Sequence, residues 1–470
     1  MTPLPQLTTP PNGDDVLSVR GGRLYLEDVS LHDLALACGT PLYVLSDRQL
    51  RTNARRWATA AKAAWSYGPT LVMPSLKANT SPALRAILNE EGAGCDVFGA
   101  AELEIALGSK VPPGHISLNG ATKSSPLLER AISAGVRVTL DSADEFERTR
   151  KLARRLGLRA HIRFRIRPWL PGTSAVSDFD PAGGPAYLSL QDYRAGMPED
   201  EVTDCLAAAI GDEHLDPAGF HAHATRQTTD LSFWAAYAQD VGAACARLSA
   251  HRSGWRPREI DLGGGFAVPR DPTARQQPFN GATAPEPADY LTAMADGLTR
   301  GLTEGGLSPD GISLQVEPGR AIYGNAGLHL ATVLNLKNQQ WPLPRTWIET
   351  DTSEAFLGDT IIERNLWTVV PADEPGRERR VDAAVTGISC GFDQLVPAMS
   401  QPHVVPGEIL AFLDTGAYQD ATASNFNAMA RPASVLVSGS QACLIKRRET
   451  LADITARDVP AGQTPISLPG

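Results

Sequence analysis

The sequence predicts an α/β protein built from a (β/α)8, TIM-like barrel and a C-terminal β-rich domain that the N-terminal segment completes. Eight short β-like runs recur between residues 70 and 319, and helical patterns separate them. Eight such units in roughly 250 residues match the spacing of a closed barrel better than that of a doubly wound open sheet. After residue 325, strand-like runs follow one another without long helices between them.

The eight barrel strands are expected in short β-like runs, and the segments between these runs have the pattern of amphipathic helices. In the segment "SPALRAILNEEGAG", Ser81 is placed to cap a helix, Pro82 suits its first turn, and glycines end it. The predicted strand runs, in order, are "TLVMPSL", "GCDVF", "HISLNG", "RVTLDS", "HIRFRIR", "GFHAHA", "EIDLGGG" and "SLQVEPG".

Four segments follow from this pattern. We expect residues 1–45 to join the β domain through the hairpin-like "LSVRGGRLYLED", and residues 46–325 to form the barrel. Residues 326–450 should form the β domain and residues 451–470 a tail. Two stretches rich in proline and glycine, 168–187 and 268–287, follow predicted strands, so they are expected at the C-terminal rim, as active-site loops or as tolerated insertions.

Composition excludes several classes of partner. The formal net charge is −10 and the pI is near 5.5, which opposes binding to nucleic acid or to anionic lipid. No stretch approaches the roughly 18 apolar residues of a membrane span, and the first 15 residues do not resemble a secretion signal, so a cytoplasmic protein is expected. The six cysteines are far apart, which predicts neither a disulfide framework nor a zinc cage.

Chemically useful residues follow several of the predicted strands. Lys77 ends the first run. In an apolar site its pKa would fall, and the neutral amine could form a Schiff base. Without the other residues at this rim, Lys77 would be interpreted as a lysine at a strand end whose ammonium group reaches solvent. Gly263, Gly264 and Gly265 follow the seventh strand, where barrels often bind phosphate. Glu317 and Arg320, in "EPGR", follow the eighth. An amine, a phosphate-binding turn, an arginine and a carboxylate at one rim predict a site for pyridoxal 5'-phosphate.

With these residues in place, the chain resembles the barrel-type (fold type III) pyridoxal-phosphate decarboxylases, such as the diaminopimelate and ornithine decarboxylases. The resemblance spans roughly residues 22 to 440. Eight motifs contribute to it in order: "PLYV", "KAN", "CDVFGAAELEIAL", "FHAHA", "LGGGF", "EPGRAIYGNAG", "GISCGFDQL" and "DTGAYQDATASNFN".

The resemblance implies a role for each cofactor residue. Lys77 should hold the cofactor, Glu317 should pair with its pyridine nitrogen, and His223 should lie against the ring. His221 and His223 are thus expected to be no metal site, although their spacing places both on one face of a strand. The phosphate should be bound by the glycine turn, Arg320 and Tyr418, and Arg165 should lie near the ring's hydroxyl side.

Cys390 corresponds by this resemblance to a cysteine that crosses a dimer interface and returns a proton to the α-carbon. A thiol suits that task because its pKa is within reach of neutral pH. The resemblance therefore implies a homodimer with shared active sites.

Three departures from the family concern substrate recognition. After the sixth strand the chain has "HATR", so Arg226 is a candidate contact to the phosphate or to an acidic substrate group, unless it points away. Gly391 follows the cysteine where diaminopimelate decarboxylases have a glutamate. Those enzymes have an aspartate three positions after that glutamate, and in this chain the aspartate, Asp393, comes one position earlier. A familiar "RPALY" stretch is absent, with Arg364 as a candidate replacement.

These departures predict a specialised decarboxylase and not a standard diaminopimelate decarboxylase. Candidate substrates are another amino acid, a D-amino acid, a conjugated intermediate or an aminoacyl group on a carrier protein. Two alternatives stay open: a racemase or other α-carbon chemistry on the same cofactor, and a non-catalytic regulatory relative.

Overall fold

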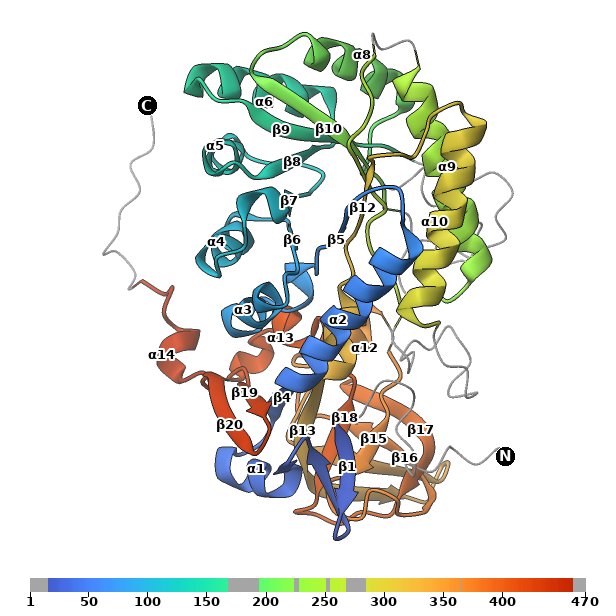
Figure 1. The fold of residues 1–470 in the computed structure, drawn as a ribbon. Coiled ribbons are helices and arrows are strands. Elements are labelled where there is room, and N and C mark those ends of the chain that lie inside the picture. The colour runs from blue at the N-terminus through green and yellow to red at the C-terminus, as the bar shows by residue number, and fades with distance from the viewer. Residues whose placement is uncertain are drawn as a thin grey trace.

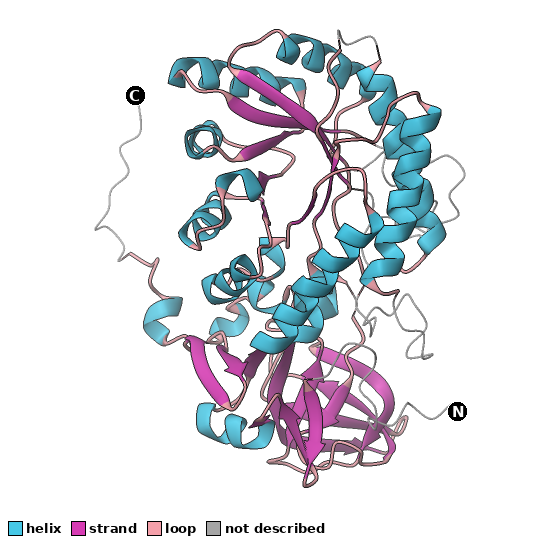
Figure 2. Ribbon diagram, in the orientation of Figure 1, coloured by secondary structure: helices cyan, strands magenta, loops and turns pink. Residues whose placement is uncertain are grey.

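The computed structural model describes residues 16–167, 194–223, 228–250, 254–267, 285–363 and 365–459. It consists of a barrel of strands and helices and a β-rich domain beneath it, with the long helix α2 (Asp47–Ala64) running from one to the other (Figure 1). Figure 2 shows helices around the barrel and strands dominating the lower domain.

Eight parallel strands form the barrel, at the positions the sequence predicts. They are hydrogen-bonded in the order β5-β12-β11-β10-β9-β8-β7-β6. Ser75, beyond β5, forms a parallel bridge with Asp96 of β6, which brings the two ends of this sheet together. The predicted barrel is therefore confirmed over the open sheet. Its strands are β5 (Thr70–Val72), β6 (Cys95–Val97), β7 (Ile116–Leu118), β8 (Arg137–Leu140), β9 (Ala160–Arg165), β10 (Leu215–His221), β11 (Glu259–Asp261) and β12 (Ser313–Val316).

Helices cover the outside of the barrel. None within the described ranges is long and apolar enough to cross a bilayer. Ser81 stands at the N-cap of its helix and Pro82 in the first turn, as predicted, but the Ser81 side chain makes no capping hydrogen bond. The barrel helices are α2, α3 (Pro82–Glu90), α4 (Ala100–Gly108), α5 (Ser125–Ala134), α6 (Ala143–Leu156), α8 (Glu199–Ile210), α9 (Leu231–Ser249) and α10 (Pro287–Glu304).

The barrel strands alternate between apolar and polar residues, and this alternation determines what fills the interior. In β7, Ile116 and Leu118 belong to the hydrophobic core, whereas Ser117 between them is buried in a hydrogen-bond network. Because successive side chains of a strand point to opposite faces, one residue in two faces the barrel interior. These inward residues are mostly polar, which contrasts with the branched apolar side chains typical of such barrels. They are Asp96, Ser117, Thr139, Arg163, Asp261 and Gln315.

The second domain is a mixed sheet that the N-terminal segment completes, as predicted. Strand β4 (Leu42–Ser46) pairs antiparallel with β13 (Gly327–Gln339) and parallel with β19 (Ala433–Ser438). The predicted hairpin, β1 (Leu17–Arg20) and β2 (Arg23–Leu26), forms a small sheet of its own with β3 (Val29–Ser30), followed by α1 (Leu31–Cys38). The remaining strands are β14 (Arg345–Thr350), β15 (Val369–Pro371), β16 (Arg379–Thr386), β17 (Gln394–Pro402), β18 (Ile409–Leu413) and β20 (Gln441–Lys446).

Strand β4 connects the two parts through its side chains. Leu42 and Val44 are buried in the core of the β domain, whereas Leu45 belongs to the core of the barrel. Four short helices complete the description: α11 (Arg320–Tyr323), α12 (Asp359–Ile362), α13 (Gln419–Thr422) and α14 (Leu451–Ile454). We keep the predicted segment limits of 45, 325 and 450 as a proposal for how the chain divides.

Replacing Val44 with Ala should lower the free energy of unfolding by about 2–3 kcal/mol, because it removes two buried methyl groups and leaves a cavity. The matched control is Val19→Ala on β1, where the side chain is 47% exposed, and a change within about 0.5 kcal/mol is expected. Urea denaturation measures both. Equal losses would contradict the position assigned to β4.

Candidate active site

Lys77 lies at the mouth of the barrel. It occupies a single 3-10 turn, Leu76–Ala78, which begins four residues after the end of β5, and its side chain is 46% exposed. The Nζ atom lies 3.0 Å from Oδ2 of Asp96, and 5.5 Å from the centre of the Phe98 ring. One side of the amine is therefore accessible, and the other side forms an ion pair with the Asp96 carboxylate.

The predicted fall in the pKa of Lys77 is wrong for this structure. Burial does lower the pKa, but the charges of Asp96, Tyr418 and Glu317 raise it more, so it lies above the ordinary value for lysine. An apolar surrounding was expected for Lys77, and nothing in the sequence indicated that Asp96, which comes from the neighbouring strand β6, would lie beside the amine.

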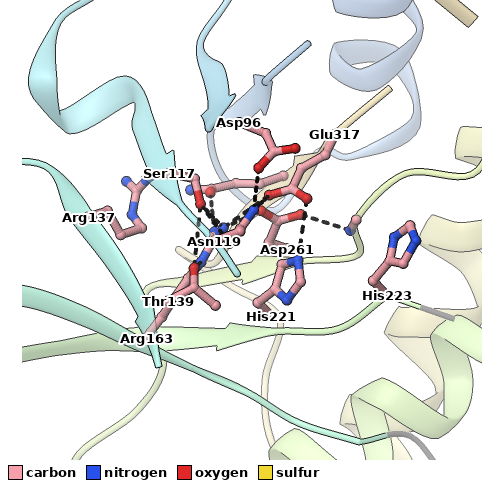
Figure 3. Close-up of polar contacts among 12 residues, drawn as sticks. Asp96, Ser117, Asn119, Arg137, Thr139, Arg163, His221, His223, Asp261 and Glu317 are labelled. Atoms are coloured by element: carbon pink, nitrogen blue, oxygen red, sulfur yellow. Dashed lines mark hydrogen bonds and ion pairs between the residues drawn. The ribbon is translucent and has the colours of Figure 1, made fainter. Parts of the chain in front are cut away.

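Glu317 lies in the same barrel mouth, just beyond β12. Nδ2 of Asn119 donates to Oε1 of Glu317 at 2.6 Å and to Oδ1 of Asp96 at 2.6 Å. Figure 3 shows Asn119 between the two carboxylates. Burial and the neighbouring charge of Asp96 raise the pKa of Glu317, and the nearby Arg163 opposes that rise.

Arg163 on β9 supplies a cation beneath these groups. Its side chain is 0% exposed, and its Nη2 lies 2.6 Å from Oδ2 of Asp261 and 3.3 Å from Oε1 of Glu317. The other donors are also engaged: Nε donates to Thr139 at 2.7 Å and Nη1 to Gln315 at 2.9 Å. Nη2 further donates to the Ser117 hydroxyl.

The two histidines have different surroundings. His221 ends β10, and its Nε2 lies 3.3 Å from Oε2 of Glu317. His223 lies farther out (Figure 3). Its Nδ1 accepts a hydrogen bond of 3.2 Å from the N–H of Gly264. Burial lowers the pKa of both rings well below the usual value, so both are neutral imidazoles.

His221, Asp261 and Glu317 are close enough together to be considered as metal ligands. However, the Arg163 guanidinium already pairs with both carboxylates. We therefore keep the prediction that the histidines serve another purpose.

The glycine turn packs directly against the Glu317 segment. The N–H of Glu317 donates to the carbonyl of Gly263 at 2.8 Å, and a Cβ on Gly264 would collide with the carbonyl oxygen of Glu317. Gly263 and Gly265 have φ values of +69° and +110°, which favour glycine. Three glycines are thus required by close approach or by backbone conformation.

Arg320 and Tyr418 meet beside this turn. The guanidinium carbon of Arg320 lies 4.9 Å from the centre of the Tyr418 ring, and Nη2 pairs with Asp359 at 2.6 Å. Nη1 of Arg320 is buried and has no hydrogen-bond partner among the described residues. The N–H of Tyr418 donates to the carbonyl of Ala78, next to Lys77, at 2.6 Å. A buried arginine donor without a partner indicates a site for an anion.

Arg165 is placed at the end of β9, and its side chain is buried. Its Nη1 lies 3.7 Å from Oδ2 of Asp141 on the neighbouring side of the barrel. Its predicted position near the cofactor ring stays a prediction.

Cys390 lies outside the barrel, on an exposed loop of the β domain. Asn427 holds this residue: Oδ1 accepts from the N–H of Cys390 at 2.9 Å, and Nδ2 donates to Sγ at 3.2 Å. Asp393 accepts from the N–H groups of Ser389 and Glu354, both at 2.6 Å, so its carboxylate braces the loop. Its predicted contact with substrate stays a prediction.

Two predicted substrate residues, Arg226 and Arg364, lie outside the described residues, as do nearly all of the 168–187 and 268–287 stretches.

Comparisons with known proteins add the decisive observation. The family model described as "Pyridoxal-dependent decarboxylase, pyridoxal binding domain" matches residues 48–324. The chain belongs to the pyridoxal-dependent decarboxylases. It is therefore a carboxy-lyase that acts on amino acids with pyridoxal 5'-phosphate as cofactor.

Curated relatives of this decarboxylase match it over nearly the whole chain. It is 30% identical to the diaminopimelate decarboxylase of Pseudomonas aeruginosa over 451 residues, covering 94% of this chain and 98% of that protein. The Methanocaldococcus jannaschii diaminopimelate decarboxylase is 27% identical over 454 residues, covering 95% and 97%.

Solved structures support the same fold. The M. jannaschii diaminopimelate decarboxylase in complex with L-lysine has a TM-score of 0.84 at 26% identity, covering 95% of this chain and 98% of that one. The lysine/ornithine decarboxylase of Vibrio vulnificus, complexed with putrescine, has a TM-score of 0.69 at 17% identity, covering 87% and 97%, and supports the fold alone.

The residues of the decarboxylase fit the cofactor. The unpartnered Nη1 of Arg320 and the glycine turn suit a phosphate, and Lys77 offers an accessible amine at the same barrel mouth. Sequence reasoning missed Asp96, Asn119, Arg163, Asp261 and Asn427. For Asp96 and Arg163 the available signal was a polar residue between two apolar ones in a strand, in "CDV" and "IRF".

Replacing Gly264 with Ala should weaken binding of pyridoxal 5'-phosphate roughly tenfold or more, equal to about 1.4 kcal/mol, because the new Cβ displaces the Glu317 segment. Gly211→Ala is the control, since a Cβ there meets nothing within 4 Å. Fluorescence titration of the apoprotein measures both. Unchanged affinity in the Gly264 variant would contradict the tight packing of this turn.

Proposed function

We propose that the protein removes the α-carboxyl group of an amino acid that has a second amino group far along its side chain. The observation that supports loss of the α-carboxyl group is the convergence of the Lys77 amine, the Glu317 carboxylate and an anion-binding turn at one barrel mouth. When bound, the cofactor supplies an electron sink for the carbanion left by loss of CO2.

The chain's own residues hold and orient that cofactor. Lys77 would bind its aldehyde carbon, and Glu317 would accept a hydrogen bond from its protonated ring nitrogen. Arg320 would bind the phosphate together with the N–H of Gly265, since the N–H groups of Gly263 and Gly264 donate to Asp261 and His223. His223 would lie against the ring. A carboxylate opposite the ring nitrogen favours decarboxylation, because the protonated ring is the stronger sink.

The relatives favour the distal amino group. The curated relatives reported above are diaminopimelate decarboxylases, and diaminopimelate has a second amino group at the far end of its side chain. The expectation that this chain is no standard diaminopimelate decarboxylase finds no support in these comparisons.

Glu354 offers a carboxylate suited to such an amino group. A Cβ on Gly391 would lie 2.8 Å from Oε1 of Glu354, so this carboxylate occupies the space beside Cys390 that the glycine leaves free. Burial and the nearby Asp393 raise the pKa of Glu354. An ammonium group bound there would offset both effects.

A second copy of the chain completes the proposed site. Cys390 is exposed on its loop, and its neighbour Phe392 is 84% exposed, as expected for a loop that enters another subunit. We assign Cys390 of one chain as the proton donor to the α-carbon in the other.

The test is incubation of the cofactor-loaded protein with diaminopimelate, lysine, ornithine, arginine and glutamate, in L and D forms, with products followed by mass spectrometry. Loss of CO2 from a diamino acid is expected, and Lys77→Ala should abolish it while the protein stays folded. Exchange of the α-hydrogen in heavy water without loss of CO2 would instead indicate a racemase. No reaction with any free amino acid would point to a conjugated or carrier-bound substrate.

Replacing Cys390 with Ala should lower kcat by about 10²–10⁴-fold, the range for a positioned proton donor, and leave cofactor affinity unchanged. Exposed Cys443→Ala is the control, and no loss is expected there. Full activity in the Cys390 variant would remove its assigned role.

A further inference from the structure

We propose that Arg163 is a positioning residue that fixes the Glu317 carboxylate and keeps it ionised for the cofactor's ring nitrogen. The inference rests on the proposed function, since it assigns Arg163 a task within the same site. It concerns a side chain that lies beneath the cofactor residues and is 0% exposed.

The first argument is geometric. Arg163 reaches residues from four other strands or strand ends: Ser117, Thr139, Gln315 and the carboxylates of Asp261 and Glu317. A planar guanidinium with all of its nitrogens engaged has one orientation available. Its Nη2 reaches the same Oε1 of Glu317 that accepts from Asn119, so this oxygen is held from two sides.

The second argument is the balance of buried charge. Four barrel strands place titratable or charged groups near Glu317: Asp96 lies on β6, Arg163 on β9, His221 on β10 and Asp261 on β11. His221 is neutral, and Lys77 pairs with Asp96 at 3.0 Å. Arg163 is therefore the cation that pairs directly with Asp261 and Glu317 among the described residues.

The consequence for Glu317 follows from electrostatics. Burial raises the pKa of Asp261 to about 6, and burial and Asp96 raise that of Glu317; Arg163 opposes both rises. Without the guanidinium, buried carboxylates would share protons, because like charges at short range cannot all ionise. A protonated Glu317 could no longer hold a proton on the ring nitrogen.

The test compares variants by the ¹⁵N chemical shift of cofactor labelled at its ring nitrogen, together with kcat. Arg163→Met should move the signal toward that of an unprotonated pyridine and lower kcat on the order of 100-fold, with KM changed less than threefold. The control is Arg85→Met: Arg85 is equally buried, but it donates to the carbonyls of Gly94 and Ala93, at 2.7 and 3.0 Å. Its ¹⁵N signal should stay at the wild-type position.

A second variant separates charge from simple packing. Asp261→Asn added to Arg163→Met removes one of the carboxylates that compete for a proton, so the ring-nitrogen signal should return part of the way to wild type. If Arg163 only filled space, the double variant would be no closer to wild type than the single one, and the proposal would be overturned.

The remaining outcomes are also decisive. If Arg163→Met does not fold, Arg163→Lys is measured instead. A smaller shift of the ¹⁵N signal in the same direction is expected, because the ammonium keeps the positive charge but cannot make the several fixed hydrogen bonds of the guanidinium. A wild-type signal in either variant overturns the inference and leaves the proposed function intact. A wild-type protein that binds no cofactor would overturn both.

Discussion

The ion pairs of Arg163 inside the barrel are the interaction on which the site depends. Asp96, Asp261 and Glu317 are all buried close to one another, an arrangement that would be strongly unfavourable without nearby cations. Lys77 pairs with Asp96 at the mouth of the barrel, and Arg163 pairs with Asp261 and Glu317. Removing either cation leaves buried charge without a partner, which is why the polar interior behaves as a unit.

The fold makes this arrangement possible. Strand alternation turns apolar residues toward the helices and polar residues toward the barrel axis, so a network can form from residues far apart in sequence. The parallel strands also bring their carboxyl ends to one rim. Lys77, Glu317 and the glycine turn therefore meet although about 240 residues separate the first from the second.

The β domain contributes to the same rim from the other side. Tyr418 binds the backbone next to Lys77 and stacks on Arg320, which in turn pairs with Asp359. The exposed Cys390 loop belongs to this domain as well, where Asn427 and Asp393 hold it. The β domain thus supports the site in the barrel of its own chain and exposes the thiol of Cys390 to solvent.

The sequence was sufficient to predict the eight barrel strands, because each is a short β-like run bounded by turn or helix signals. It also placed Lys77, Glu317 and the glycine turn after strands of the barrel, and the structure has them there, beyond β5, β12 and β11; their roles stay predictions. The Lys77 pKa was predicted wrongly because Asp96 belongs to another strand, and spacing does not reveal which charges will face an amine. Asn427 gave no signal, because its contact with Cys390 joins two loops that are 37 residues apart.

The most direct test of the account is reduction of the cofactor-loaded protein with borohydride, followed by digestion and peptide mass spectrometry. The account predicts a phosphopyridoxyl group on the peptide that contains Lys77 and on no other. A label on another lysine, such as the buried Lys123, or no label at all, would contradict the placement of the cofactor at this barrel mouth.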